Sequence, residues 1–133
     1  MEEKFIVKQI VDGLHSEGYF VATEIANLYR SADIAVYNDK NEEVWVIECK
    51  NTCISKAIKQ SRTHKLSADK VYIGTPFRKT RSVTLDKIRE AGVGLFYVMG
   101  DGRIELAMEA SDNASPWDPA REKLKSRILA SVK

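Results

Sequence analysis

Hydrophobic residues recur at helical spacing in four parts of the chain. The predicted helices span residues 2–17, 54–66, 82–91 and a C-terminal segment that begins at Asp118. Gly18 follows the first helix as a stop signal, and Gly92 stands at the position after the third, where a left-handed backbone conformation ends many helices. Asp118-Pro119 provides an N-cap and a first-turn proline for the fourth helix.

Short runs rich in β-branched and aromatic residues lie between these helices and predict six strands. They span residues 19–24, 33–37, 44–50, 71–73, 94–98 and 103–108. Three consecutive strands should form an antiparallel meander, and strands separated by helices should add parallel pairs. The expected fold class is α/β, a mixed central sheet with helices on both faces. We expect residues 1–133 to form one domain, with 110–118 a linker to the C-terminal helix.

The stretch VWVIECK, residues 44–50, has the strongest pattern in the chain. Its first four residues are apolar on both faces, so we expect a central strand that is covered on both sides. Val44, Val46, Glu48 and Lys50 share one face of this strand, and that face becomes ionic only at its last two positions. Glu48 and Lys50 are therefore predicted to emerge from a packed sheet at its rim.

A second acidic residue is predicted to face Glu48. If strands 33–37 and 44–50 form a hairpin around Lys40-Asn41, Asp33 lies directly opposite Glu48, and longer loops of the same parity give the same pairing. Two carboxylates that close repel each other unless a positive charge lies between them, and a divalent cation fits. The alternative is a salt-bridge cluster in which Lys50 or Arg30 neutralises both acids.

Asp33 on one strand and Glu48-Cys49-Lys50 at the end of the next resemble the signature of the PD-(D/E)xK nuclease superfamily, whose fold is called restriction-endonuclease-like. The order of predicted elements over residues 2–75 matches the core of that fold, and the resemblance extends to about residue 108. Ala32 replaces the proline of the signature. Many relatives carry an additional glutamate before the aspartate; Glu24 fits that position, with Glu3 and Glu17 as alternatives.

The resemblance implies metal-dependent phosphodiester hydrolysis. Asp33, Glu48 and the backbone carbonyl of Cys49 would hold Mg²⁺, with Mn²⁺ as a substitute, and Lys50 would orient the attacking water or stabilise developing charge. Glu24 would assist with a second ion or the water. Some exonuclease-like members carry a glutamine followed four residues later by an aromatic residue, and here Gln60 is followed by His64.

Basic residues are concentrated in the middle of the sequence. Residues 50–81 contain nine basic residues and one acid, Asp69, whereas the whole chain has a formal net charge of only +2. Such asymmetry indicates a surface for a polyanion, although a solvated helix face gives the same pattern. The residues expected to contact nucleic acid, with DNA the expected form, are Lys56, Lys59, Arg62, His64, Arg78, Lys79 and Arg81.

The cysteines and the length of the apolar runs indicate the cellular setting of the protein. Cys49 and Cys53 form neither a disulfide framework nor a zinc pattern, which favours a reducing, cytoplasmic setting. No apolar run has the length of a membrane span, so no membrane association is expected. A homodimer through Leu124, Ile128 and Leu129 is plausible, although these residues also suit the core. The alternative function is a catalytically silent nuclease-fold protein that binds nucleic acid or another protein as a regulator or inhibitor.

Overall fold

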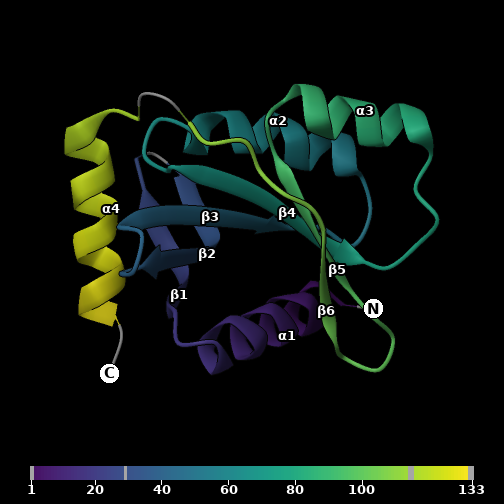
Figure 1. Ribbon diagram of the computed structural model, residues 1–133, viewed down its shortest axis with the longest axis horizontal. Helices are drawn as coiled ribbons and strands as arrows, with labels where there is room; N and C mark the ends of the chain where they lie inside the picture. The colour runs from purple at the N-terminus through teal and green to yellow at the C-terminus, as the bar shows by residue number, and fades with distance from the viewer. Residues whose placement is uncertain (1, 29, 114–115, 132–133) are drawn as a thin grey trace.

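The computed structural model describes residues 2–28, 30–113 and 116–131, which form one six-stranded sheet and four helices (Figure 1). The helices are α1 (Glu3–Ser16), α2 (Ile54–His64), α3 (Ser82–Glu90) and α4 (Asp118–Ser131). The strands are β1 (Phe20–Asn27), β2 (Arg30–Asn38), β3 (Glu43–Cys49), β4 (Lys70–Pro76), β5 (Gly94–Val98) and β6 (Ile104–Met108).

The strands lie in the sheet in the order in which they occur in the sequence. β1, β2 and β3 form an antiparallel meander, β3–β4 and β4–β5 are parallel pairs, and β6 returns antiparallel to β5. The parallel pairs arise where α2 and α3 carry the chain back across the sheet. The predicted mixed α/β sheet is therefore confirmed.

Helices cover both faces of the sheet, also as predicted (Figure 1). α1 packs its buried residues Ile6, Ile10 and Leu14 on the face that carries Trp45 and Ile47. The other three helices cover the opposite face, with α4 over β1 to β3, and with α2 and α3 over β4 and β5. β3 is consequently buried from Val44 to Cys49, which confirms that it is a central strand.

β4 is longer than the predicted strand 71–73, whose pattern places Gly74 beyond its end. Gly74 instead pairs with Phe96 inside the sheet. A Cβ atom at this position would clash with the Ile10 side chain of α1. Gly74 therefore allows α1 to approach the sheet closely, which is a common reason for glycine within a strand. Gly92, by contrast, follows α3 with φ +71°, as its predicted position requires.

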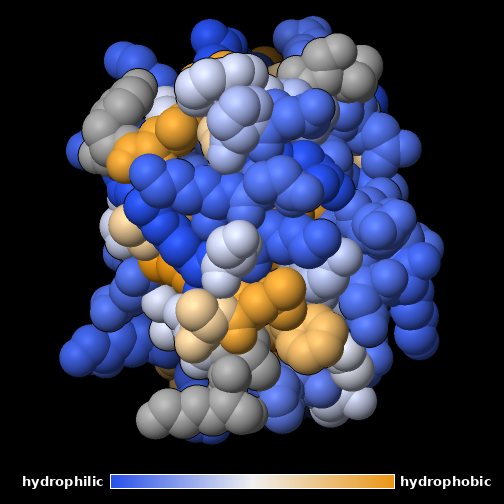
Figure 2. All heavy atoms as spheres, turned by 90° about the vertical axis from the view of Figure 1, so that its left-hand side faces the viewer, coloured by the Kyte–Doolittle hydropathy of each residue, from blue (hydrophilic) through white to orange (hydrophobic). Residues whose placement is uncertain are grey.

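The C-terminal helix contributes two of its three predicted interface residues to the core. Leu124 and Ile128 are buried against the sheet, whereas Leu129 remains 40% exposed. The side of the molecule formed by α4 is mainly hydrophilic, with hydrophobic residues in smaller separate areas (Figure 2). Leu124 and Ile128 thus serve the core, the alternative that the sequence left open, and the homodimer stays a prediction.

Two backbone hydrogen bonds attach the segment that precedes α4 to the rest of the domain. Of the predicted linker 110–118, residues 114 and 115 lie outside the described residues. The Asn113 N–H donates to the Asp69 carbonyl, and the Trp117 N–H donates to the Leu66 carbonyl. Both hydrogen bonds join this segment to the loop between α2 and β4.

Candidate active site

The pairing of β2 with β3 follows the predicted register. Ile34 pairs with Ile47 and Ala35 with Val46, so the next residues beyond the last pair are Asp33 and Glu48. The connecting loop contains residues 39–42 rather than two residues, but its parity is the same and the pairing is unchanged. The alternation along β3 is also as predicted, since Ile47 faces α1 and Glu48 faces α2.

The carboxyl groups of Asp33 and Glu48 are in direct contact. Burial of the Asp33 carboxyl, then its hydrogen bond with the Glu48 carboxyl and the charge of Glu48, raise the pKa of Asp33 from 3.8 to about 7. The Cys49 N–H, which donates to Asp33 Oδ2 at 2.8 Å, and the positive charge of Lys50 oppose this rise in the pKa. A proton on Asp33, or a cation that takes its place, therefore relieves the repulsion between the two carboxylates.

Lys50 extends the line of β3 beyond the carboxylates. Its N–H donates to the Gly74 carbonyl at 2.9 Å, which fixes the backbone against β4, and its side chain is half-buried. Within the residues that the structure describes, neither Lys50 nor Arg30 forms an ion pair with Asp33 or Glu48. The salt-bridge cluster that was the alternative interpretation of these acids is thus not formed.

Glu48 is instead held from the interior by a chain of buried polar side chains. His64 Nε2 bonds to Glu48 Oε1, and the other ring nitrogen, Nδ1, lies 2.8 Å from the Asn27 amide nitrogen. The Ser67 hydroxyl donates to the Asn27 amide oxygen at 2.7 Å. All four residues are at least 95% buried. Each contact is satisfied when His64 carries its proton on Nε2 and donates it to Glu48.

Sequence reasoning missed Asn27 and Ser67, and it placed His64 incorrectly. His64 is fully buried, so the prediction that it contacts nucleic acid is corrected: its ring reaches Glu48 and not the surface. Gln60, one turn earlier on α2, has a buried side-chain oxygen without a hydrogen-bond partner among the described residues. Asn27 and Ser67 lie 40 residues apart in sequence, and only the fold brings them together.

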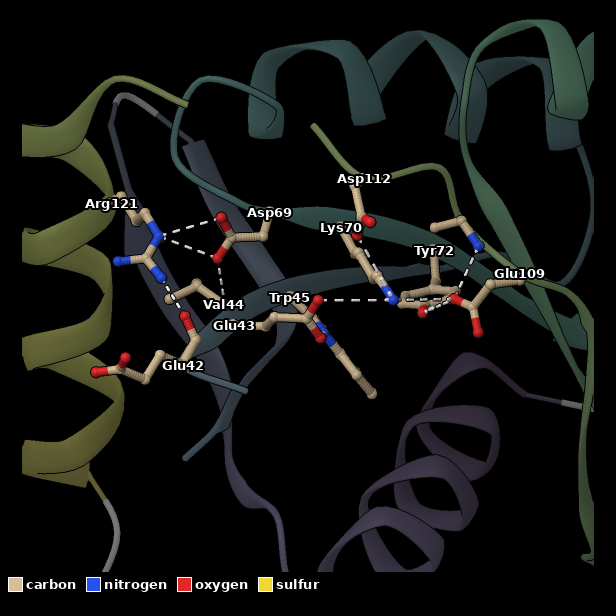
Figure 3. Close-up of polar contacts among 11 residues, drawn as sticks. Glu42, Glu43, Val44, Trp45, Asp69, Lys70, Tyr72, Glu109, Asp112 and Arg121 are labelled. Carbon is tan, nitrogen blue, oxygen red and sulfur yellow. Dashed lines mark hydrogen bonds and ion pairs between the residues drawn. The ribbon is translucent and has the colours of Figure 1, made fainter. Parts of the chain in front are cut away.

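A pocket of about 230 Å³ opens beside the carboxylate pair. Asp33 and Cys49 line it together with Glu24 and Glu3, two of the three candidates for the additional acid. Glu24 adopts φ +49°, a strained value for a residue other than glycine, at the position opposite Asp33 where the pairing of β1 with β2 is interrupted. Glu17 follows the C-terminal end of α1 and lines a different pocket, whose wall includes the ion-paired Lys70 (Figure 3).

The donor set fits a metal that retains several water ligands. The described residues contain no group of three or more His, Cys, Asp or Glu side chains arranged to hold a metal ion. Asp33 and Glu48 each have one oxygen committed to Cys49 N–H or His64, which leaves the other oxygen of each carboxylate available. Mg²⁺ commonly binds to one or two carboxylates and completes its shell with water and substrate phosphate, so these residues suit it.

The predicted nucleic-acid residues other than His64 lie on α2 and on the segment between β4 and α3. Lys56, Lys59, Arg62, Lys79 and Arg81 are exposed, and none of them forms an ion pair with a described residue. Arg78 is half-buried, and its Nη2 donates to the Asn51 carbonyl and to Thr75 Oγ1. The basic stretch of the sequence therefore remains largely available on the surface.

Comparisons with known proteins add little to this geometry. A scan against protein-family models and a search of curated proteins find no match for the chain. A solved structure of SfsA from Pyrococcus furiosus in complex with Ca²⁺ is similar at 17% identity and a TM-score of 0.43, over 82% of this chain and 61% of that chain. Similarity at this level carries no argument about function, and the nuclease superfamily stays a prediction.

None of the helices in the described residues has the length and hydrophobicity needed to span a bilayer.

Proposed function

We propose that this protein is a metal-dependent nuclease that hydrolyses phosphodiester bonds, with DNA as the expected substrate. The observation that carries the proposal is the contact of Asp33 and Glu48 at the end of a buried central strand, beside Lys50. Two ionised acids in contact destabilise a fold unless a proton or a cation neutralises one of them, so a pair kept at this position indicates a cation site. The same three residues carry the resemblance to the nuclease superfamily.

Each residue of the site has a distinct role in this proposal. Asp33, Glu48 and the Cys49 carbonyl would hold Mg²⁺, which supplies charge neutralisation at the scissile phosphate and lowers the pKa of bound water. The half-buried Lys50 ammonium would orient the attacking water or stabilise negative charge that develops on the phosphate. Glu24, on the wall of the adjoining pocket, would hold the water or a second ion.

The buried chain behind Glu48 gives the site its rigidity. His64 occupies Glu48 Oε1, which leaves the other carboxylate oxygen of Glu48 for a metal ion. Asn27 and Ser67 fix the ring in turn. Positioning a reactive carboxylate through packed, hydrogen-bonded neighbours is how proteins keep a site preorganised. His64 is thus a positioning residue in this proposal, and its ring makes no contact with substrate.

Cleavage assays with matched variants test the proposal. Labelled single-stranded, double-stranded, overhanging and branched DNA and RNA are incubated with the purified protein in Mg²⁺, Mn²⁺ or chelator. We expect metal-dependent cleavage that Glu48→Gln, Asp33→Asn and Lys50→Met each abolish. Glu105→Gln and Lys123→Met, which change exposed residues on β6 and α4, serve as controls and should retain activity. Cleavage by purified Glu48→Gln at the wild-type rate would end the proposal.

A second candidate is a nuclease-fold protein that binds nucleic acid without cutting it. Two observations favour it: Glu48 is already bonded to His64, and the described residues include no three-ligand metal cluster. This candidate predicts nucleic-acid affinity that is indifferent to divalent metal, and no heat of binding when Mn²⁺ is titrated calorimetrically into the protein. A nuclease should bind Mn²⁺ measurably, and Asp33→Asn should weaken that binding.

A further inference from the structure

We propose that a pocket between the N-termini of α2 and α3 binds a phosphate group of the nucleic-acid strand. This inference rests on the proposed function, because it names where that substrate is held next to the reacting position. The pocket has a volume of about 450 Å³ and lies apart from the one that Asp33 and Glu24 line.

The charge of the pocket has one sign. Four basic residues line it, Arg78, Lys79, Arg81 and Lys87, and the lining includes no acidic side chain. None of the four forms an ion pair with any residue in the described part of the chain. A concave surface with four cations concentrates anions, and a multiply charged group gains most from it.

Two helix N-termini add to this positive potential. α2 begins after Cys53 and α3 after Arg81, and both of these residues line the pocket. Neither helix has a side-chain hydrogen bond at its N-cap, and neither has an acidic residue in its first turn. Most helices use Ser, Thr, Asp or Asn to satisfy their first amide groups. The Lys56 and Thr84 N–H groups donate to the Cys53 and Arg81 carbonyls. The amides that precede them in each helix, and the positive ends of both helix dipoles, are what an anion from outside the chain would meet.

Arg78 is fixed in place but lacks a counter-charge. Its Nη2 donates to the Asn51 carbonyl and to Thr75 Oγ1, which holds the guanidinium at the end of β4. Its Nε is buried and has no acceptor among the described residues. A half-buried cation without a counter-charge is unfavourable, and a phosphate in the pocket that Arg78 lines would supply the missing negative charge.

The position of the pocket connects it with the candidate active site. Asn51, which accepts the bond from Arg78, directly follows Lys50 in the sequence. Figure 1 shows that α2 and α3 begin at the same end of the sheet, where the arrows of β3 and β4 terminate. A strand whose reacting phosphate lies near Lys50 would therefore place another of its phosphates in the pocket. Ser55 and Thr84, which also line it, offer hydroxyl donors for that phosphate.

Phosphate binding is measurable without cleavage. Amide resonances of ¹⁵N-labelled protein are followed in chelator while inorganic phosphate is added, with chloride at the same ionic strength as the reference. We expect saturable shifts at Ser55 and Thr84 in the wild type. Lys87→Gln combined with Arg81→Gln should weaken binding about tenfold, as expected for the loss of a charge-assisted hydrogen bond. Both side chains are exposed, so this variant should fold even if Arg78→Gln does not. Lys123→Gln, on α4, is the matched control and should bind like the wild type.

Oligonucleotides with and without a terminal phosphate then identify the source of the group. Tighter binding of the phosphorylated strand assigns the pocket to a terminal phosphate, and equal binding that still depends on Arg81 and Lys87 assigns it to an internal phosphodiester. The absence of saturable shifts at the pocket amides, or equal affinity of the double variant and the wild type for phosphate, would overturn the inference.

The proposed function fails separately, because Glu48→Gln should abolish cleavage and leave phosphate binding unchanged. A wild type that binds phosphate but cleaves no nucleic acid would remove the nuclease proposal and keep the pocket. A wild type that cleaves nucleic acid without binding phosphate would remove the pocket proposal and keep the nuclease proposal.

Discussion

Replacing Asp33 with asparagine should stabilise the metal-free protein at neutral pH and leave its stability near pH 4 unchanged. The Asp33 carboxyl contacts Glu48 and has a pKa raised to about 7 in the folded protein. A carboxyl whose pKa is raised on folding contributes stability that is fully present below the unfolded pKa. That contribution is lost as the pH rises through the folded pKa. Asparagine cannot ionise, so its contribution should not change over this range.

The size of the effect follows from the two pKa values. The difference between 3.8 and about 7 corresponds to about 4 kcal/mol of unfolding free energy, at about 1.36 kcal/mol per pH unit. Because Asp33 is only partly buried, solvent screens the repulsion, and we expect about half of that, roughly 2 kcal/mol. The asparagine oxygen should still accept the Cys49 N–H, and its amide should still donate to Glu48, so little else changes.

Urea denaturation in chelator, followed by the tryptophan fluorescence to which the buried Trp45 contributes, measures this difference. Wild type, Asp33→Asn and the control Asp39→Asn are compared at intervals from pH 4 to pH 8. Asp39 lies in the exposed hairpin loop, so its variant should follow the wild type throughout. A constant difference between Asp33→Asn and wild type across this range, or a less stable Asp33→Asn at pH 8, would refute the carboxyl–carboxyl contact.

Added metal extends the same experiment. An ion that binds only the folded protein stabilises it by about 2.7 kcal/mol at a hundredfold excess over its dissociation constant. Wild type should therefore gain stability from millimolar Mn²⁺ at pH 8, and Asp33→Asn should gain less. If Asp33→Asn keeps the full gain, Asp33 is not a ligand of that ion.

Three further predictions test other parts of the molecule. His64→Gln should reduce the cleavage rate about tenfold or more, as seen when neighbours that orient metal ligands are removed. Asn27→Leu should also reduce the rate. A wild-type rate in both variants would show that Glu48 needs no positioning. Gly74→Ala should lower the unfolding free energy by about 1–3 kcal/mol, because the added Cβ meets the Ile10 side chain. Gly100→Ala, whose added Cβ has no atom within 4 Å, should lower it little. Equal effects of the two substitutions in denaturation would contradict the close approach of α1. Charge reversal of the exposed basic face of α2 should weaken nucleic-acid binding and reduce the slope of log affinity against log salt by about 3, and an unchanged slope would place the contact elsewhere. The residues changed to Glu in that variant are Lys56, Lys59 and Arg62.

The central part of the fold was predictable because its pattern has only one interpretation. A strand that is apolar on both faces must be covered on both sides, which places β3 inside the sheet. Side chains in a hairpin alternate with a period of two, so the parity of the loop was sufficient to bring Asp33 opposite Glu48 even though the loop is longer than expected. Local signals of this kind do not depend on distant parts of the chain.

His64 shows where the reasoning from sequence failed, although a signal was present. The buried residues of α2 are Ala57, Ile58, Ser61 and His64, which form one stripe at helical spacing. The exposed basic residues occupy other positions of the same helix. The residue type of His64 suggests the basic surface, but its spacing places it on the inner stripe. A polar residue on such a stripe needs a buried partner, and Glu48 is that partner.

Other features had no local signal at all. Asn27 lies beyond the predicted end of its strand, and Ser67 lies in a turn, so neither residue is distinguishable from an ordinary surface residue in the sequence. A glycine such as Gly74 likewise looks the same in the sequence whether it ends a strand or allows a helix to pack closely against that strand. In each case the cause is a contact between distant segments, which depends on how α1 and α2 pack against the sheet.

The predicted pH dependence and the predicted metal dependence have one origin. The proton shared by Asp33 and Glu48 and a divalent cation would occupy the same two free carboxylate oxygens, because Cys49 N–H and His64 hold the other two. Proton and metal must then compete, and each ion that binds below the raised pKa of Asp33 releases a proton. Saturating metal removes the like-charge repulsion that the asparagine variant relieves in its absence. The difference in unfolding free energy between Asp33→Asn and wild type at pH 8 should therefore shrink as Mn²⁺ is added. The substitution and the metal titration thus test the same pair of oxygens.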